Sequence, residues 1–467
     1  MENRIVRLTG VTLRGFKNVR YGHLDLTNPR VNTPASILGL YGQNGSGKTG
    51  LIDALGVLKY ALGGQPVPRH VVDYIHVDET HADLTYHLEI RDGTSGAVYP
   101  VRYELQLQRT ASSLHDNEWE HSDVEGVMLS KESLWHGVEQ TENPKRMACV
   151  LDTDSPEDIA FLPRVRHERV VKREKEAAVN LLVEKQLARK TSRSFLFSKE
   201  LRDMLQEQEE PLSLILETLA YYGSYELFVI TTAHTGLVSI HALPLAFSYR
   251  ETQGGAVGNI LLKLNEPSLI PERAFRVVDK VVSRMNIVLQ QLVPGLVIGI
   301  RNLGSQMLKD GSLGCRVQMV SRKDAKEIPL QCESDGIKKL ISVLQLLIMM
   351  YNRPSFTVAI DELDSGVFEY LLGETLRILA EHGKGQLIFT SHNLRPLETL
   401  DKGFIAFTTT NPENRYLRLT GVKANHNLRD FYYRDIVLGE QRETVYAPTN
   451  NSEIAFAFRE AGEYDAP

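Results

Sequence analysis

The sequence has few cysteines and no long apolar run. Cys149, Cys315 and Cys332 are scattered along the chain and none forms a CxxC pair, so we expect neither a disulfide framework nor a zinc cluster. The densest apolar run, residues 340–350, is eleven residues long, whereas a membrane span needs about 20. The first residues lack the apolar core of a signal peptide. We therefore expect a cytoplasmic protein with no membrane partner.

The chain also lacks a strong excess of charge of either sign. It has 53 Lys and Arg against 59 Asp and Glu, a formal net charge of −6, so its surface as a whole is not built to coat nucleic acid. With 42% hydrophobic and 24% charged residues, the composition is that of an ordinary globular protein. At about 150 residues per domain, the length of 467 residues allows two or three lobes.

One glycine-rich segment carries the strongest functional signal. Residues 35–41 form a short apolar run typical of a buried strand, and apolar residues at helical spacing begin at Leu51. Between them, Gly-Gln-Asn-Gly-Ser-Gly-Lys-Thr matches the phosphate-loop pattern GxxxxGK followed by Ser or Thr. In such a loop, backbone N–H groups surround the β-phosphate, Lys48 reaches the β and γ oxygens, and Thr49 binds Mg²⁺. A glycine-rich turn without a ligand is the alternative. The residues predicted to bind the nucleotide, ATP or GTP, are Gly42, Asn44, Gly45, Ser46, Gly47, Lys48, Thr49 and Gly50.

Two later strands end in residues that suit phosphate hydrolysis. The apolar strand 356–360 is followed by Asp361, which we expect to hold Mg²⁺ through water, and by Glu362, placed to orient and deprotonate the attacking water. The strand 386–390 leads to His392, which can contact the γ-phosphate and sense its loss. A surface histidine in a strand-to-helix turn is the alternative reading of His392. The predicted catalytic residues are Glu362, Lys48 and His392, and the predicted metal ligands are Thr49 and Asp361.

A second anion site is predicted ahead of the acidic strand. Ser334 and Gly336 open a strongly apolar helix, and the free N–H groups and the dipole at a helix N-terminus favour a phosphate. Because the phosphate loop already serves the nucleotide of its own chain, we expect Ser334 and Gly336 to contact the γ-phosphate held by a second protomer. A serine that only caps the helix is the alternative.

These motifs follow one another in an order that resembles one superfamily. The phosphate loop, the distant signature serine, the Asp-Glu strand, the Leu363-Asp364-Ser365 loop and the strand-end histidine resemble the ABC and SMC-like ATPases. The resemblance implies an α/β fold: an ABC-type P-loop ATPase head with a mixed sheet, flanking helices and an antiparallel β lobe, together with an inserted helical arm. It also implies a homodimer that encloses two ATP molecules, with Asp364 on the dimer seam.

The resemblance divides the chain into four parts. Residues 1–160 would form the first part of the ATPase head, with the phosphate loop and a β-meander lobe. Residues 326–445 would form the second part, with the signature, the acidic strand and the histidine. Between them, residues 161–325 are expected to be a helical insertion and connecting segment, and residues 446–467 a polar, acidic tail.

Three segments narrow the resemblance. Leu-Arg-Gly-Phe-Lys-Asn, residues 13–18, and the Glu-Ser-Asp-Gly signature resemble the soluble OLD, RecF and abortive-infection groups, and residues 361–373 resemble the ATPase subunit of PARIS-type anti-phage systems. The implied function is an ATP-binding and hydrolysing sensor and scaffold in an antiviral abortive-infection system, toxin–antitoxin-like in its organisation. Such a subunit would assemble around ATP and control a separate effector, a TOPRIM or HNH nuclease, in response to a phage trigger protein.

The sequence departs from these groups in two places. Only 75 residues follow His392, too few for the TOPRIM nuclease domain that continues OLD-type proteins, so the effector is expected in another chain. The glutamine of the family's lid loop has no clear counterpart, and Gln106 and Gln108 are the available candidates.

Other functions stay open at this point. A RecF-like or SMC-like DNA-repair ATPase would clamp DNA across the dimer. Residues 164–190, with nine Lys or Arg against four Glu, supply a basic stretch for DNA, RNA or an acidic partner protein. A solvated helix face is the commoner reason for such a charge run. A transporter subunit is disfavoured by the unusual signature and by the Gly-Phe-Lys-Asn segment.

Overall fold

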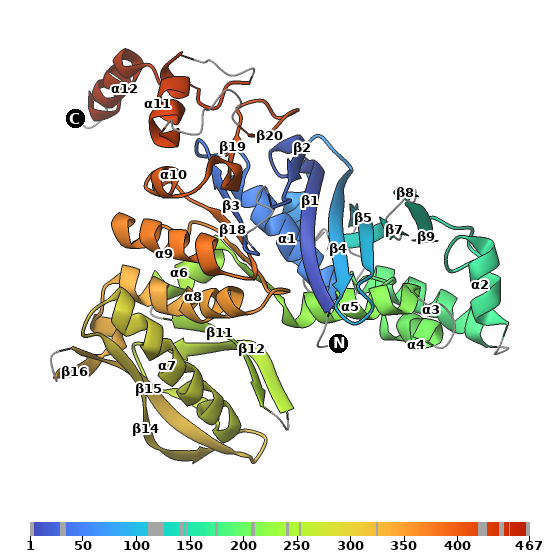
Figure 1. Cartoon of the computed structure of the whole chain (residues 1–467), viewed down its shortest axis with the longest axis horizontal. Helices are drawn as coiled ribbons and strands as arrows, with labels where there is room; N and C mark the ends of the chain where they lie inside the picture. The colour runs from blue at the N-terminus through green and yellow to red at the C-terminus, as the bar shows by residue number, and fades with distance from the viewer. Residues whose placement is uncertain are drawn as a thin grey trace.

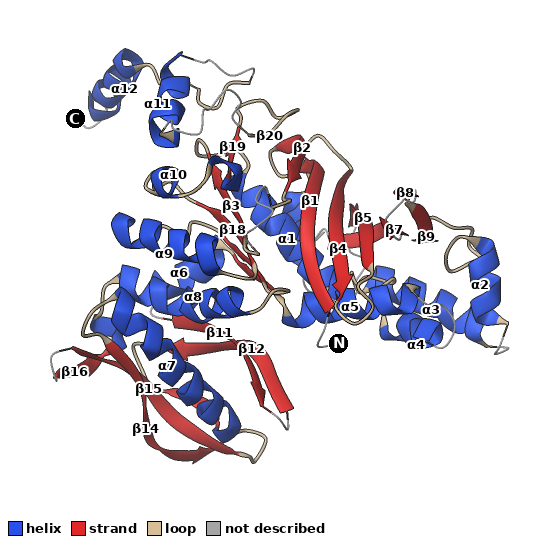
Figure 2. Ribbon diagram, in the orientation of Figure 1, coloured by secondary structure: helices blue, strands red, loops and turns tan. Residues whose placement is uncertain are grey.

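A mixed central sheet and an antiparallel sheet enclose helix α1 (Lys48–Leu62) between them (Figures 1 and 2). No helix among the described residues is both long and apolar enough to span a membrane. The computed structural model describes residues 4–28, 34–110, 126–137, 139–140, 143–144, 147–172, 176–206, 211–239, 242–251, 254–323, 326–418, 427–438, 443–447 and 449–463.

The central sheet has the strand order β10-β17-β18-β3-β19-β20. Its first five strands are parallel, and β20 runs antiparallel to β19. Because both faces of the sheet are covered, these strands are short, nearly unbroken apolar runs. The strands are β3 (Ser36–Tyr41), β10 (Leu227–Ile230), β17 (Thr357–Ile360), β18 (Gln386–Thr390), β19 (Ile405–Thr408) and β20 (Tyr416–Leu417).

Successive residues of β3 pack on opposite faces of this sheet, as the period of a strand requires. Leu38 and Leu40 belong to the core that also contains α1 and α5 (Leu212–Tyr225). Ile37 and Tyr41 belong to the core formed with α8 (Asp335–Asn352) and α9 (Glu369–His382). The expected mixed α/β head with flanking helices is therefore confirmed.

The antiparallel lobe has six strands in the order β2-β1-β4-β5-β6-β9. It is larger than a simple meander, the form expected for the β lobe within residues 1–160, because the strands at the N-terminus join the same sheet. Alternate residues of β4 are buried, and among them Tyr86 donates a hydrogen bond of 2.6 Å to the carbonyl of Ala54 on α1. The strands are β1 (Arg4–Phe16), β2 (Val19–Asp25), β4 (His81–Asp92), β5 (Val98–Thr110), β6 (Gly126–His136) and β9 (Ala148–Asp152).

Residues 161–325, expected to be a helical insertion and connecting segment, contain helices in their first half and several strands in their second half. The first part forms α2 (Arg164–Val171), α3 (Ala177–Lys190) and α4 (Lys199–Gln206). Further on, β10 joins the central sheet beside β17. Its sequence, Leu-Phe-Val-Ile, is a short and mostly buried apolar run, as is typical of a strand inside a parallel sheet. A separate lobe follows, with α6 (Thr232–Ser239), β11 (Ala242–Glu251), β12 (Gly254–Lys263), β13 (Ser268–Pro271), α7 (Glu272–Leu292), β14 (Val297–Met307), β15 (Leu313–Lys323) and β16 (Lys326–Pro329).

The C-terminal part adds small elements at one end of the central sheet. The polar, acidic tail contains a helix, α12 (Asn451–Glu463), whose residues 451–462 are all exposed. The remaining elements are the 3₁₀ segments Arg69–Tyr74, Leu330–Cys332 and Lys402–Phe404, the two-residue strands β7 (Glu139–Gln140) and β8 (Asn143–Pro144), and the helices α10 (Pro396–Thr399) and α11 (Leu428–Leu438).

Candidate functional site

The glycine-rich loop between β3 and α1 has a backbone that needs glycine. Gly45 and Gly47 have φ values of 74° and 96°, in the left-handed region that side chains other than glycine rarely adopt. At Gly42, a Cβ atom would lie 1.9 Å from Oγ1 of Thr408 on β19. The loop therefore stays tightly folded against the sheet, with its N–H groups at the N-terminus of α1, where a phosphate is favoured.

Lys48 is buried at the start of α1. Its ammonium donates hydrogen bonds of 2.8 Å to the carbonyl of Gly42 and 3.0 Å to the carbonyl of Gln43. Burial lowers the pKa of Lys48, and the carboxylates of Asp361 and Glu362 partly oppose this shift. The hydrogen bonds of this desolvated ammonium group go to neutral carbonyl groups, and a phosphate that entered the loop would give it a partner of opposite charge.

The carboxylate of Asp361 suits a magnesium ligand. The side chain is buried, and its Oδ1 accepts a hydrogen bond of 2.5 Å from Oγ1 of Thr390. Its Oδ2 has no hydrogen-bond partner among the described residues. The hydroxyl-bearing Thr49 lines the same pocket. Carboxylate and hydroxyl oxygens are the donors that Mg²⁺ takes in phosphoryl-transfer sites, so the residues present fit this ion.

Glu362 has a strained backbone. Its φ of 49° lies in the left-handed region, an uncommon conformation for a residue other than glycine. The N–H of Glu362 donates a hydrogen bond of 2.8 Å to Oγ1 of Thr390, and the N–H of Leu363 donates one of 3.0 Å to the carbonyl of Thr390. Such strain persists where the surroundings fix the chain, and it is concentrated at functional sites.

The turn that carries His392 is fixed by Asp364. Oδ2 of Asp364 accepts hydrogen bonds from the backbone N–H groups of His392, at 3.0 Å, and Asn393, at 2.9 Å. The side chain of His392 is exposed at the edge of the site. Asp364 itself does not line the pocket, so in a single chain its observed role is to position the histidine turn.

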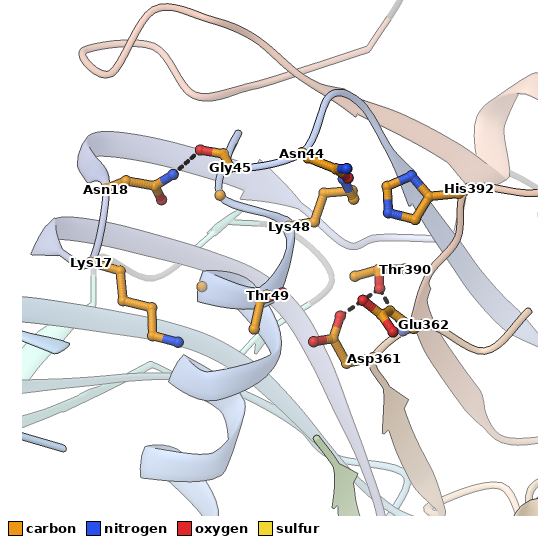
Figure 3. Close-up of a pocket in the computed structure, with 12 residues that line it drawn as sticks. Lys17, Asn18, Asn44, Gly45, Lys48, Thr49, Asp361, Glu362, Thr390 and His392 are labelled. Atoms are coloured by element: carbon orange, nitrogen blue, oxygen red, sulfur yellow. Dashed lines mark hydrogen bonds between the residues drawn. The ribbon is translucent and has the colours of Figure 1, made fainter. Parts of the chain in front are cut away.

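These residues meet in one pocket of about 300 Å³ (Figure 3). The phosphate loop lies on one side, and the ends of β17 and β18 supply Asp361, Glu362 and His392 on the other. Of the predicted residues, Gly42 and Ser46 support the loop from behind, and Ser46 bonds to the carbonyl of Gln43 and to Thr408. The lining residues are Lys17, Asn18, Asn44, Gly45, Gly47, Lys48, Thr49, Gly50, Asp361, Glu362, Thr390 and His392.

Three lining residues were missed from the sequence: Lys17, Asn18 and Thr390. Lys17 forms an ion pair with the buried Asp53 of α1, and Asn18 donates from its side-chain amide to the carbonyl of Gly45. The first two end the Leu-Arg-Gly-Phe-Lys-Asn segment that carried the family resemblance, so a signal for them was present. Nothing in the local sequence marks Thr390 as more than the last residue of a strand.

Ser334 and Gly336 lie outside the pocket of their own chain. Ser334 is exposed and caps α8, accepting a hydrogen bond of 3.3 Å from the N–H of Ile337. Gly336 packs so closely on the loop after the acidic strand that a Cβ atom would lie 1.8 Å from the carbonyl oxygen of Gly366. The serine cap considered as the alternative is therefore present, and contact with the nucleotide of a second protomer stays a prediction.

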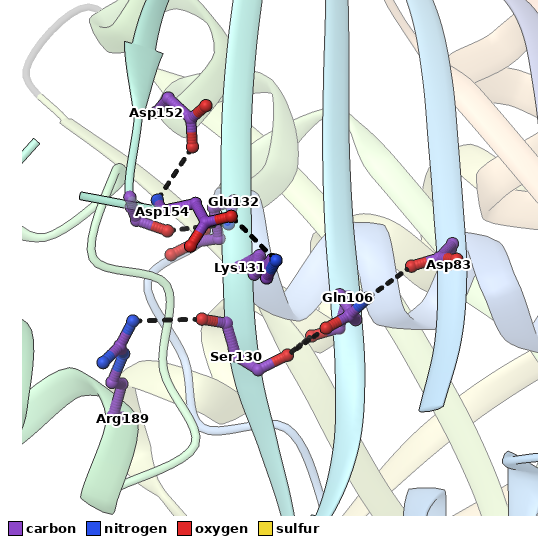
Figure 4. A network of polar contacts seen from close by, with 9 residues as sticks. Asp83, Gln106, Ser130, Lys131, Glu132, Asp152, Asp154 and Arg189 are labelled. Atoms are coloured by element: carbon purple, nitrogen blue, oxygen red, sulfur yellow. Dashed lines mark hydrogen bonds and ion pairs between the residues drawn. The ribbon is translucent and has the colours of Figure 1, made fainter. Parts of the chain in front are cut away.

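Neither glutamine considered for the lid loop lines the pocket. Gln106 lies in the antiparallel lobe, where its amide donates a hydrogen bond of 2.9 Å to Asp83 and its carbonyl accepts one of 2.9 Å from Ser130 (Figure 4). Gln108 lies further along the same strand, β5. The position of the lid glutamine is therefore not identified by these two candidates.

Similar structures were found at low similarity. The SMC head domain of Pyrococcus furiosus with an extended coiled coil, bound to the C-terminal domain of ScpA, is 11% identical over 89% of this chain and 96% of that chain, with a TM-score of 0.40. The SMC head domain of Thermotoga maritima is 15% identical over 88% and 99%, with a TM-score of 0.37. The recombination mediator RecF with ATP is 11% identical over 89% and 100%, with a TM-score of 0.35. We infer no function from scores this low.

A family profile gives a firmer result. No curated protein matches the chain significantly. The profile described as "AAA domain, putative AbiEii toxin, Type IV TA system" matches residues 37–398, which include the phosphate loop, the acidic strand and His392. Because this match covers more than half of the chain, the protein belongs to this AAA family of ATPases.

Proposed function

We propose that the chain binds ATP with Mg²⁺ and hydrolyses it. The observation that supports this most is the convergence of Lys48, Thr49, Asp361, Glu362 and His392 on one pocket from three separate parts of the chain. Lys48 and the loop N–H groups hold the phosphates, and Mg²⁺, held by Thr49 and Asp361, would neutralise charge that develops on them. Glu362 orients the attacking water and accepts its proton, and His392 contacts the γ-phosphate.

We also propose that two chains enclose two nucleotides. Ser334 is exposed at the N-terminus of an 18-residue helix, where the N–H groups favour an anion, yet it lies outside the pocket of its own chain. A second protomer that presents this helix end to the pocket would complete the site. Within one chain, Asp364 and Gly366 connect the N-terminus of α8 with the nucleotide pocket, since Asp364 holds the turn of His392 and Gly366 contacts Gly336.

A mass measurement combined with a hydrolysis assay tests both statements. Glu362→Gln is expected to bind ATP, hydrolyse it 10²-fold to 10⁴-fold more slowly, as for loss of a general base, and accumulate as an ATP-bound dimer in light scattering. Lys48→Ala is the matched control, which should neither bind ATP nor dimerise with it. Normal hydrolysis by Glu362→Gln would remove the catalytic assignment, and a mass that ignores ATP would remove the dimer.

In the cell, we propose that this ATPase is the sensor and scaffold of an anti-phage system and restrains a separate nuclease effector of the TOPRIM or HNH type until a phage trigger protein is present. The family description, which names an AbiEii toxin and a type IV toxin–antitoxin system, supports this role. Phage plating with and without the neighbouring gene tests it: protection should require both chains and should be lost with Lys48→Ala. Protection by the ATPase chain alone would contradict the effector assignment.

The alternative function is an ATPase that clamps DNA. The basic stretch of residues 164–190 supports it less than its charge alone suggests. Three of its cations are used inside the chain: Arg166 donates to the carbonyl of Val150, Lys185 to Ser155 at 2.7 Å, and Arg189 to the carbonyl of Ser130 at 3.2 Å. These bonds attach the helical arm to neighbouring parts of the chain, and Figure 4 shows the one from Arg189 to Ser130 on β6. ATP-stimulated, salt-dependent binding of duplex DNA would favour the alternative.

A further inference from the structure

The C-terminal helix α12 presents an apolar face that none of the described residues covers. Ile454, Ala457, Phe458 and Ala461 follow the i, i+3, i+4, i+7 spacing by which an amphipathic helix binds a groove. All four are exposed, and the side chain of Phe458 is 78% exposed. Phe456 points to the other side of the helix, where the guanidinium of Arg459 lies 6.0 Å from its ring centre.

A groove of matching character lies between α7, α8 and α9. It has a volume of about 350 Å³, within the range of pockets that hold apolar ligands. Two of its polar side chains are already bonded within their own helices: Asn352 donates to the carbonyl of Ile348 at 2.8 Å, and Thr375 to that of Leu371 at 2.7 Å. The lining residues are Val288, Gln291, Leu292, Leu344, Leu347, Ile348, Tyr351, Asn352, Thr375, Ile378 and Leu379.

The root of α12 is fixed at the far end of the central sheet from this groove. Val445 is buried in the core, and the N–H of Ala447 donates a hydrogen bond of 2.9 Å to Oε1 of Gln43 in the phosphate loop. That loop follows the carboxyl ends of the parallel strands, whereas the groove includes the last turn of α8, which leads into the opposite end of β17. In Figure 1, α12 lies at the top left of the molecule and α7 at the lower left.

We propose that the apolar face of α12 binds the groove between α7, α8 and α9 of a second copy of this chain. One and the same chain carries an apolar helix face and an apolar groove, neither covered by a described residue, and the bond of Ala447 to Gln43 keeps the root of α12 away from the groove of its own chain. The second copy is therefore the occupant that supplies both surfaces. This contact uses no residue of the nucleotide pocket. It therefore forms without ATP and joins chains in a way that the ATP dimer does not.

Light scattering of the full chain without nucleotide tests the contact. Wild type is expected to self-associate at micromolar concentration, and Phe458→Asp to weaken the association about 30-fold or more, as for loss of a central aromatic anchor. Phe456→Asp is the matched control on the opposite face and should associate like wild type. Ile378→Asp, at the 44% exposed rim of the groove, should weaken the association like Phe458→Asp.

Mixing the two weakened variants gives the decisive result. The intact α12 of Ile378→Asp fits the intact groove of Phe458→Asp, so the mixture should regain a species of two chains that neither variant forms alone. A wild type that stays monomeric without ATP, a Phe458→Asp chain that associates normally, or a mixture that stays monomeric would each overturn the proposal. Circular dichroism of each variant shows whether it is folded. Repetition with Lys48→Ala, expected to associate like wild type, separates this contact from the ATP dimer.

Discussion

The hydroxyl of Thr390 donates a hydrogen bond of 2.5 Å to Oδ1 of Asp361. Oγ1 of Thr390 also accepts a hydrogen bond of 2.8 Å from the backbone N–H of Glu362. One threonine at the end of β18 therefore orients the proposed magnesium ligand and the backbone of the proposed base, both at the end of β17. Because Oδ1 is held in this way, Oδ2, which has no partner in the part of the chain that the structure describes, is the oxygen left for the metal shell.

Replacing this threonine should impair hydrolysis without disrupting the sheet. Thr390→Val keeps the shape of the side chain but removes the hydrogen bond to Asp361, and loss of such a supporting partner typically lowers metal affinity or activity about 10-fold to 100-fold. We expect a lower kcat and a higher Mg²⁺ requirement in a steady-state ATPase assay. Thr390→Ser restores the hydroxyl and should recover most of the activity. Equal activity of the valine variant and wild type would show that Asp361 needs no such support.

Loss of the Asn18 side chain should weaken nucleotide binding. Asn18→Ala removes the bond from the side-chain amide to the carbonyl of Gly45, and one hydrogen bond contributes about 1 kcal/mol, so the apparent affinity for ATP should fall about 5-fold. Fluorescence titration with a labelled ATP analogue measures the change. The melting temperature should hardly move, since the loop lies at the surface, and a large loss of stability would instead indicate a structural role.

Adding a methyl group at the signature should uncouple it from the acidic strand. In Gly336→Ala, the new Cβ would lie 1.8 Å from the carbonyl oxygen of Gly366, so the loop that carries Asp364 must move. Overpacking of this kind costs about 1–3 kcal/mol, and we expect hydrolysis to fall more than ATP binding. Calorimetry and an ATPase assay check both. Ser334→Ala removes the hydroxyl that caps Ile337 within the chain, and this loss should lower the free energy of unfolding by about 1 kcal/mol. Unchanged hydrolysis in Gly336→Ala would show that the close contact has no functional role.

The buried side chain of Lys59 should make the free energy of unfolding rise with pH. Burial lowers its pKa from 10.5 to about 8, although the ammonium donates to the carbonyl of Leu227 at 2.7 Å and lies 4.5 Å from the ring centre of Phe228. Between about pH 8 and 10.5 the unfolded chain binds more protons than the folded chain, so the free energy of unfolding rises with pH. Over this window, wild type should gain up to about 3 kcal/mol relative to Lys59→Met, measured by urea unfolding. A difference that is independent of pH would contradict the lowered pKa.

The local parts of the site were predictable from the sequence because their signals are local. The phosphate loop needs consecutive glycines between a strand and a helix, and Asp361, Glu362 and His392 directly follow buried strands. Parallel strands end at the same edge of a sheet, which explains why these residues meet. Strand β10 was missed because a four-residue apolar run carries too little periodicity to separate a strand from a helix.

The sequence by itself determined the phosphate loop, the acidic pair, the strand-end histidine and the α/β class, because each depends on residue types at short, fixed spacing. Only the tertiary structure decided that Thr390 orients Asp361, that Asn18 reaches Gly45, and that Gly336 packs on Gly366. These contacts join residues that lie 27 to 30 positions apart, on different elements. They depend on how the strands are ordered in the sheet and on how closely two loops approach, and no short-range spacing records either.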